Sequence, residues 1–125
     1  MVNYPVGDFL IRIKNAAMAG NNSIEVESTK LIVAVAEVLK REGFLSEIKK
    51  SKDKLKVQIA FKSKRPVLMD IKLVSKLGLR IYKNVDEIKQ KRGASIYVIS
   101  TPAGVLSSKE AIKKNVGGEV IAEVY

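Results

Sequence analysis

The sequence predicts an α+β fold in which two small α/β subdomains pack together. Apolar residues recur at helical spacing in two N-terminal segments, and apolar and polar residues alternate in several later segments. A charged stretch with a proline and no periodicity separates the two groups. We expect the first unit, residues 1–62, to run helix–strand–helix–strand–strand, and the second, residues 67–125, to be mostly β with one short helix.

The first predicted helix covers residues 6–19. Its apolar side chains follow the i, i+3, i+4, i+7 spacing of an amphipathic helix, and Pro5 suits its start because the first turn tolerates a proline. Asp8, Arg12 and Asn15 fall on one polar face, where Asp8 and Arg12 are spaced to pair across one turn. The alternative for this face is that it is simply solvated.

A short strand at residues 24–27 is predicted to lead into a second helix. We expect Ser28 to cap that helix and Gly43 to stop it after Glu42. Apolar residues occur nearly all round it, so it should be largely buried, between a sheet and another helix. Lys30 lies in its first turn, where helix N–H groups and an ammonium can meet a phosphate. An ordinary exposed lysine is the alternative.

Two antiparallel strands, at residues 44–48 and 55–61, complete the first unit, and the second of them alternates cleanly between apolar and polar positions. The charged connection at residues 62–66 links the halves. Short strands at 68–74 and 79–83 and a helical turn at 86–88 are predicted to follow it.

The C-terminal segment is predicted to be strand, turn, helix and strand. The first strand covers residues 96–101, and Ser107 and Glu110 have the three-residue spacing of a capping box that opens the helix. Gly117-Gly118 can stop that helix. The closing strand is predicted at residues 120–124.

The turn at residues 100–104, Ser-Thr-Pro-Ala-Gly, is the predicted binding element. Pro102 ends the preceding strand, and Gly104 permits the positive φ of a tight reversal. The hydroxyls of Ser100 and Thr101 would stand on a tip held by two strands and a helix, where binding groups are usually carried. An ordinary turn without a partner is the alternative.

Positive charge is concentrated in the middle of the chain. The chain has 23 Lys and Arg against 13 Asp and Glu, a formal net charge of +10. Between Lys49 and Arg92 there are 15 cations and 4 acids, so this span carries +11 and the remainder −1. The clustering predicts a polyanion such as nucleic acid as the partner. An acidic protein, an anionic membrane or a merely solvated surface are the alternatives.

The composition speaks against catalysis. The chain has no His and no Cys, so the usual general base, nucleophile and soft metal ligands are missing, and no disulfide can form. It also lacks the glycine pattern of a phosphate loop or dinucleotide site. We therefore expect that the protein is not an enzyme and that it binds no cofactor, no metal and no small-molecule substrate. A membrane partner is not expected either, because no run of about eighteen apolar residues and no secretory-signal layout occurs.

Five segments resemble one known family. They are Val6 to Ala16, Gly78 to Tyr82, Ser100-Thr101-x-x-Gly104-Val105, Ser107-x-x-Glu110-Ala111, and Gly117-Gly118-Glu119-Val120-Ile121. In order and spacing they resemble ribosomal protein S8, the eighth protein of the small ribosomal subunit, over essentially the whole chain.

The resemblance implies a structural constituent of the small ribosomal subunit in the cytoplasm. It would bind small-subunit ribosomal RNA directly in its central domain and assist the folding and assembly of that RNA. Neighbouring small-subunit proteins are implied as partners, as is, in bacterial members, the protein's own operon mRNA. The residues alone leave open a basic protein-interaction module that binds an acidic partner without RNA.

The resemblance also implies which residues contact RNA. The Ser-Thr turn would read an irregular helical junction, Arg80 would hold a phosphate, and Tyr82 would stack on or hydrogen-bond to a sugar or base, with strand packing as its alternative role. Glu119 would accept from a base amino group or a 2′-hydroxyl, or else orient the turn. The full expected set is Arg12, Asn15, Lys30, Arg80, Tyr82, Ser100, Thr101, Pro102, Ala103, Gly104, Ser107 and Glu119.

The turn departs from the family at two positions. The family usually has Ser-Thr-Ser-Lys-Gly, whereas Pro102 and Ala103 remove a hydroxyl and a cation here. We expect the backbone shape, together with Ser100, Thr101 and Ser107, to keep the site working.

Overall fold

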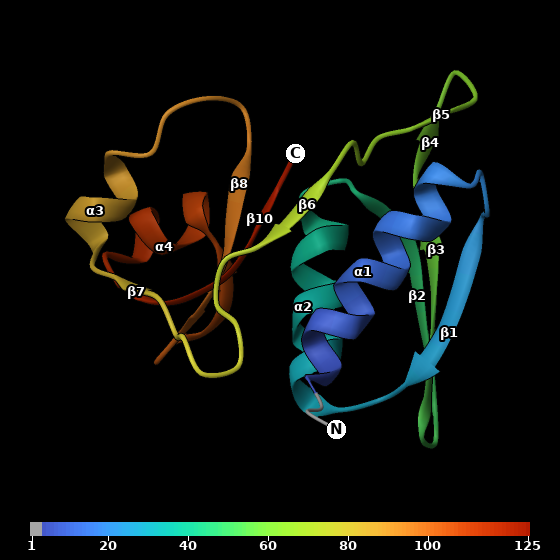
Figure 1. Ribbon diagram of the computed structural model, residues 1–125, viewed down its shortest axis with the longest axis horizontal. Helices are drawn as coiled ribbons and strands as arrows, with labels where there is room; N and C mark the ends of the chain where they lie inside the picture. The colour runs from blue at the N-terminus through green and yellow to red at the C-terminus, as the bar shows by residue number, and fades with distance from the viewer. Residues whose placement is uncertain (1–3) are drawn as a thin grey trace.

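Two long helices lie between a three-stranded sheet and a five-stranded sheet in the computed structural model, which describes residues 4–125 (Figure 1). The first three residues of the predicted N-terminal unit lie outside the described residues. The first half contains α1 (Pro5–Met18), β1 (Ser23–Glu27), α2 (Lys30–Arg41), β2 (Leu45–Ser51) and β3 (Lys54–Ile59). Its sheet is antiparallel in the order β1-β3-β2. The predicted helix–strand–helix–strand–strand order is therefore confirmed.

The first helix forms because its apolar stripe can be buried. Val6, Phe9, Leu10 and Ile13 are buried, as the periodicity predicts. The predicted ion pair between Asp8 and Arg12 is wrong: the Arg12 guanidinium instead donates to the carbonyl of Glu25 on β1, at 3.0 Å. The side chain thus ties α1 to the neighbouring strand rather than to its own helix.

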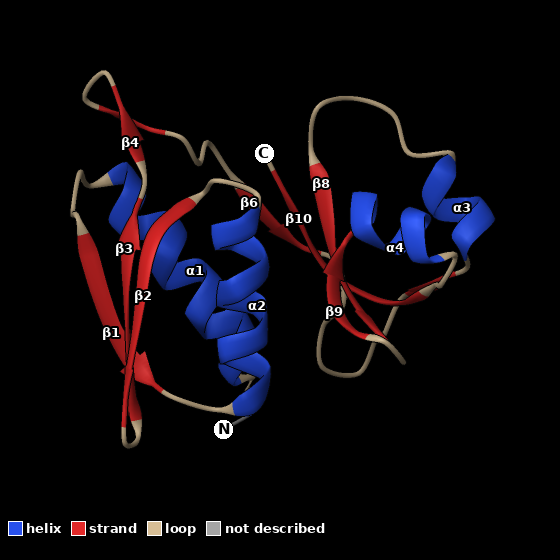
Figure 2. Cartoon of the chain, turned by 180° about the vertical axis from the view of Figure 1, so that it is seen from behind, coloured by secondary structure: helices blue, strands red, loops and turns tan. Residues whose placement is uncertain are grey.

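The second helix is capped one residue later than predicted. Thr29, not Ser28, accepts the orphan N–H of Ile32 at 3.2 Å. The backbone N–H of Ser28 donates to the carbonyl of Asp53 in the β2–β3 turn, at 2.8 Å. The helix contacts β2, α1 and also β9 of the second half, which sequence reasoning did not anticipate (Figure 2).

The connection between the halves is a small hairpin rather than an irregular link. Strand β4 (Phe61–Lys62) pairs with β5 (Arg65–Pro66). Ser63 and Lys64 at its tip have φ of 54° and 67°, in the left-handed region that most residues avoid. The hairpin projects from one end of the first half (Figure 1).

The second half is built around its last strand. Its elements are β6 (Ile71–Leu73), β7 (Tyr82–Lys83), α3 (Val85–Lys89), β8 (Ile96–Thr101), β9 (Gly104–Ser107), α4 (Ser108–Lys114) and β10 (Gly118–Val124). Strand β10 is central, with β8 on one side and both β6 and β7 on the other. The mostly β character is confirmed, but β9 was not predicted. The helical turn predicted at residues 86–88 lies within α3, a second short helix that an Asn84–Glu87 capping box opens.

The glycine pair before β10 serves packing more than helix termination. Asn115, with φ 57°, is the left-handed residue that caps α4. A Cβ at Gly117 would overlap the Lys83 carbonyl, and one at Gly118 would overlap the Ser100 carbonyl. Only glycine therefore lets β10 begin so close to both β7 and β8.

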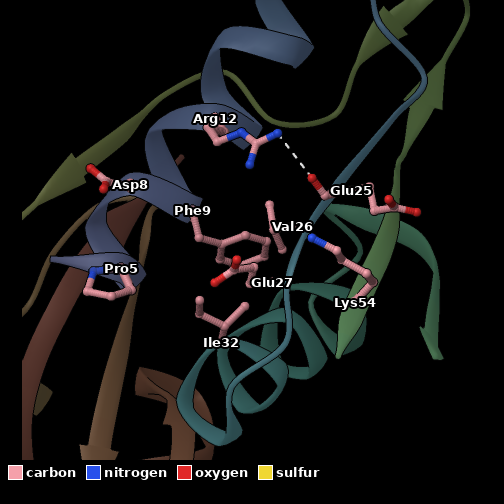
Figure 3. Close-up of a pocket in the computed structure, with 9 residues that line it drawn as sticks. All are labelled: Pro5, Asp8, Phe9, Arg12, Glu25, Val26, Glu27, Ile32 and Lys54. Carbon is pink, nitrogen blue, oxygen red and sulfur yellow. Dashed lines mark hydrogen bonds between the residues drawn. The ribbon is translucent and has the colours of Figure 1, made fainter. Parts of the chain in front are cut away.

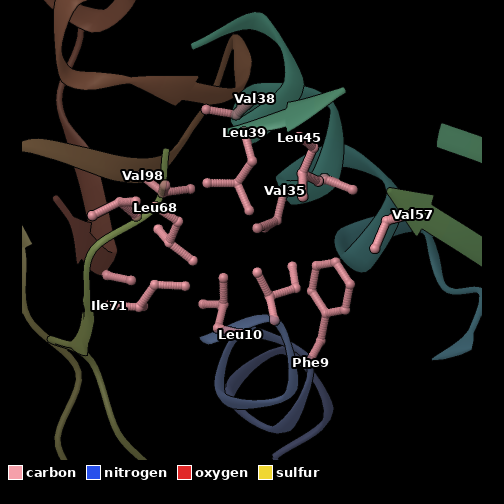
Figure 4. Close-up of a cluster of buried hydrophobic side chains, with 14 of the residues drawn as sticks. Phe9, Leu10, Val35, Val38, Leu39, Leu45, Val57, Leu68, Ile71 and Val98 are labelled. Atoms are coloured by element: carbon pink, nitrogen blue, oxygen red, sulfur yellow. The ribbon is translucent and has the colours of Figure 1, made fainter. Parts of the chain in front are cut away.

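One hydrophobic core joins the two halves. Figure 4 shows Phe9 and Leu10 of α1 and Leu39 of α2 facing Ile71 and Val98 of the second half. A smaller cluster, formed by Ile88, Ile99, Leu106, Ala111 and Val120, lies within the second half. Within the described residues, no helix is long and apolar enough to cross a membrane.

Candidate nucleic-acid interface

The predicted binding turn is the tip of the β8–β9 hairpin. Thr101 pairs with Gly104 across a two-residue loop, and Gly104 has a φ of 111°. The Thr101 hydroxyl donates to the Gly104 carbonyl at 2.7 Å and accepts the N–H of Ala103 at 3.1 Å. Its only proton is therefore used to close the turn, and one lone pair remains for a partner. Pro102 and Ala103 are exposed and contribute backbone and apolar surface.

Three predicted site residues lie side by side across three strands. Ser100 on β8 is the direct partner of Glu119 on β10, and Glu119 is the direct partner of Tyr82 on β7. Directly opposed residues of antiparallel strands share one face, so we call this alignment the Ser100–Glu119–Tyr82 rung. The next pair along, Ile99 and Val120, is buried in the smaller core. Tyr82 is 67% exposed, which excludes strand packing as the role of its ring.

Arg80 is held next to this rung. Its Nη1 lies 3.3 Å from Oε2 of Glu119, and its guanidinium lies over the ring of Tyr4, 5.0 Å from the centroid. Arg80 is still exposed, so it can meet a phosphate while Glu119 and Tyr4 restrict its orientation.

A cleft of about 400 Å³ opens between the halves beside Arg80 and Glu119. Its other walls come from the start of α1, from the start of α2 at Thr29 and Leu31, and from Leu77 in the loop before β7. Lys30 is exposed next to Thr29. The structure thus places Lys30 near the edge of a cleft that Arg80 lines.

Arg12 and Asn15 lie apart from this group. Arg12 lines a different pocket of about 410 Å³ between α1 and β1, together with Asp8, Glu25, Glu27 and Lys54 (Figure 3). Three carboxylates and only two cations line this pocket, which does not favour a phosphate. Asn15 is exposed further along α1 and lines neither of these pockets.

Ser107 acts from beneath the hairpin. It is fully buried, and its hydroxyl accepts the N–H of Glu110 while its own N–H donates to the Glu110 carboxylate, so the predicted capping box is confirmed. Burial tends to raise the pKa of Glu110, but the Arg41 guanidinium and the Ser107 amide hold that pKa below its ordinary value of 4.5. Arg41 on α2 grips this carboxylate through two hydrogen bonds of 3.0 and 3.1 Å.

The cations of the central span do not form one patch. Five exposed lysines, Lys49, Lys50, Lys52, Lys54 and Lys56, lie along the β2–β3 hairpin, whereas Lys62, Lys64 and Arg65 lie on the β4–β5 hairpin. The tips of these hairpins are at opposite ends of the first half (Figure 1). Lys91 is nearly buried and pairs with Glu123 at 3.7 Å. The cations of the central span are therefore distributed around the molecule rather than concentrated at the rung and turn.

Sequence reasoning missed two residues that hold the site. Ser75 is fully buried, and its hydroxyl bonds to Val120 on β10 and to Ile81, the residue before β7. Tyr4 donates its hydroxyl to the Ser75 carbonyl at 3.3 Å and lies under Arg80. The only available signal was a lone serine at the end of an apolar run, just before the Gly78 turn.

Comparison with known proteins identifies the family. The family model described as Ribosomal protein S8 matches residues 4–125. The small ribosomal subunit protein uS8 of Enterococcus faecalis is 42% identical over 127 residues, covering 97% of this chain and 96% of its own length. That of Roseiflexus castenholzii is 40% identical over 130 residues, covering 99% and 98%. That of Prochlorococcus marinus is 38% identical over 128 residues, covering 97% and 96%. The resemblance inferred from five short motifs is thereby confirmed, and the chain belongs to the ribosomal protein S8 family, whose members are rRNA-binding proteins of the small ribosomal subunit and not enzymes.

Proposed function

We propose that the face formed by the β8–β9 turn and the Ser100–Glu119–Tyr82 rung recognises small-subunit ribosomal RNA and helps it fold during assembly. The observation that supports this most is the alignment of a hydroxyl, a carboxylate and an exposed phenol on one rigid face, with Arg80 beside them. RNA helices offer a shallow minor groove with 2′-hydroxyls, and irregular junctions add exposed base edges. Small donors and acceptors on a rigid face suit that surface.

Affinity and selectivity would come from different parts of the molecule. The dispersed lysines and arginines neutralise phosphates on any RNA and make binding salt-dependent. The turn and the rung carry little net charge, because Arg80 and Glu119 offset each other. Selectivity would therefore depend on the shape and hydrogen-bonding groups of this face rather than on its charge.

The departure at Pro102 and Ala103 is compatible with this role. The turn is closed by two hydrogen bonds of the Thr101 hydroxyl, to the Gly104 carbonyl and from the Ala103 N–H, and neither bond involves the side chains at positions 102 and 103.

The same face would also bind an operon mRNA segment that reproduces the rRNA junction. Competition between the two RNAs for one protein site would test that extension.

The main test compares an rRNA fragment containing the irregular junction with a plain duplex of equal length, across salt concentrations. Wild-type protein should bind the junction fragment more tightly at every salt concentration. Equal binding to both RNAs would contradict the proposal, and no RNA binding would favour an acidic protein partner instead.

Charge removal on the β4–β5 hairpin provides the second arm of that test. Changing Lys62, Lys64 and Arg65 to Gln should weaken binding to both RNAs alike. The salt slope, which is the slope of log binding constant against log salt concentration, should flatten by about 0.7–0.9 per lost phosphate contact. The matched control changes Lys109, Lys113 and Lys114 of α4 to Gln, an equal loss of charge outside the basic span. If the two triple variants behave identically, the cations of the central span have no special role.

A further inference from the structure

We propose that Ser75 is a positioning residue for RNA recognition, because its buried hydroxyl fastens the segment that carries Arg80 and Tyr82 to strand β10. This inference rests on the proposed function and deepens it. The Ser75 hydrogen bonds would hold the rung and Arg80 in place before RNA binds.

The Ser75 hydroxyl bridges the two segments that carry the site side chains. It donates to the carbonyl of Val120 at 2.7 Å and accepts the N–H of Ile81 at 3.0 Å. Ile81 lies between Arg80 and Tyr82, and Val120 follows Glu119. One buried hydroxyl therefore links the two backbone segments on which Arg80, Tyr82 and Glu119 lie.

The hydroxyl replaces a missing ladder bond. Strand β10 pairs with β7 at Gly118 and Glu119 and with β6 from Ala122 onward, which leaves Val120 and Ile121 between the two partners. The Val120 N–H is satisfied by the Ile81 carbonyl at 2.9 Å, and its carbonyl accepts from Ser75. Without the hydroxyl, the Val120 carbonyl and the Ile81 N–H would both lose this partner in a buried setting, which is unfavourable.

Tyr4 supports the same loop from the other half of the molecule. Its hydroxyl donates to the Ser75 carbonyl at 3.3 Å, and its ring lies beneath the Arg80 guanidinium. Arg80 is thus constrained by the Tyr4 ring and by Glu119, on a loop that Ser75 fixes. Such preorganisation reduces the side-chain freedom that is lost when RNA binds.

The test is Ser75→Ala in the full chain, measured on the junction fragment and on the plain duplex across salt. The preference for the junction should fall about tenfold, and the salt slope measured on the junction fragment should decrease by roughly the value of one phosphate contact, because Arg80 is no longer held beside the rung. Binding to the plain duplex should change less than about twofold.

A double-mutant cycle separates positioning from general stabilisation. If Ser75 acts through Arg80, Ser75→Ala should reduce the junction preference only slightly further in a protein that already carries Arg80→Gln. The fold-loss of preference in the double variant should then be well below the product of the two single-variant fold-losses. Multiplicative losses would overturn the proposal. An equal loss of affinity for both RNAs in Ser75→Ala would overturn it as well.

Two further variants guard against trivial outcomes. Val57→Ala removes buried side-chain volume on β3, away from the loop, and lowers stability. It should leave the junction preference unchanged; if it reproduces the Ser75→Ala effect, the proposal fails.

Tyr4→Phe removes one hydroxyl contact and keeps the ring, so it should lower the junction preference in the same direction as Ser75→Ala but less. If Ser75→Ala does not fold, an unchanged preference in Tyr4→Phe overturns the inference. A wild-type protein with no preference would instead overturn the proposed function itself.

Discussion

Thr101 combines a structural and a recognition role in one side chain. Its hydroxyl donates to Gly104 and accepts from Ala103, so it shapes the turn before any partner arrives. The remaining lone pair can accept from a 2′-hydroxyl or a base amino group. This arrangement explains how the turn can keep its form with Pro102 and Ala103 in place of the family's usual serine and lysine.

Thr101→Ala should weaken binding to the junction fragment by about 1–3 kcal/mol, because both the turn closure and the acceptor are lost. Thr101→Ser keeps the hydroxyl and is the matched control, with an affinity close to that of the wild type. Equilibrium binding of the junction fragment and the plain duplex measures the effect. A loss of only a few tenths of a kcal/mol in Thr101→Ala would remove Thr101 from the site.

Among the elements, α4 connects the hairpin to the first half. Its capping box joins Ser107 of β9 to Glu110, and Arg41 of α2 holds the Glu110 carboxylate by two hydrogen bonds. Helix α2 also contacts β9 directly. The orientation of the β8–β9 hairpin therefore depends on an ion pair between helices that are far apart in the sequence.

The Arg41–Glu110 pair should make stability depend on acid. The pKa of Glu110 is lower in the folded protein than its ordinary value of 4.5, so the charged form stabilises the fold above that pH. That contribution is lost as the pH falls through the folded-state pKa. Glu110→Gln can still cap the helix but lacks the charge.

The free energy of unfolding, measured by urea denaturation at several pH values, should therefore separate wild type from Glu110→Gln most at neutral pH. The two should converge in acid, once the pH has fallen through the folded-state pKa of Glu110 and the carboxyl is protonated. Glu37→Gln, at an exposed position of α2, is the control and should show no such convergence. A difference between wild type and Glu110→Gln that is constant with pH would contradict the assignment.

At the scale of the whole molecule, the two sheets share a core. Leu39 of α2 is fully buried in the cluster that contains both first-half and second-half residues, and Lys14 of α1 pairs with Asp70 of the second half at 2.8 Å. Helices α1 and α2 thus serve both sheets. The division into units of residues 1–62 and 67–125 stays a prediction about where the chain divides, and the shared core implies that the units unfold together.

Leu39→Ala should lower the free energy of unfolding by about 2–5 kcal/mol, through lost burial and the cavity left behind. Far-ultraviolet circular dichroism follows the long helices, while tyrosine fluorescence follows mainly the second half, which holds Tyr82, Tyr97 and Tyr125. We expect coincident transitions from both probes in the wild type and in the variant. Separate midpoints in the wild type would mean that each unit is stable alone.

Several features of this protein followed from the sequence by itself. The helical stripe from Val6 to Ile13, the alternation in β3 and the Ser107–Glu110 capping box all occur in the structure where the sequence places them. The family also followed from short motifs, because a turn, a cap and a glycine pair at fixed spacing are local patterns. Periodicity and capping involve residues within one or two turns of each other, so a linear sequence displays them.

Tertiary structure decided which of these parts meet. It put the α2 cap at Thr29, whose hydroxyl accepts the Ile32 N–H, while the Ser28 N–H donates to the β2–β3 turn. Strand pairing aligned Ser100, Glu119 and Tyr82 on one face. Packing placed Arg12 and Asn15 apart from that face and brought the Ser75 hydroxyl to its two backbone partners. Strand partners and the bonds of a buried hydroxyl depend on how distant segments pack, and no spacing along the chain encodes that choice directly.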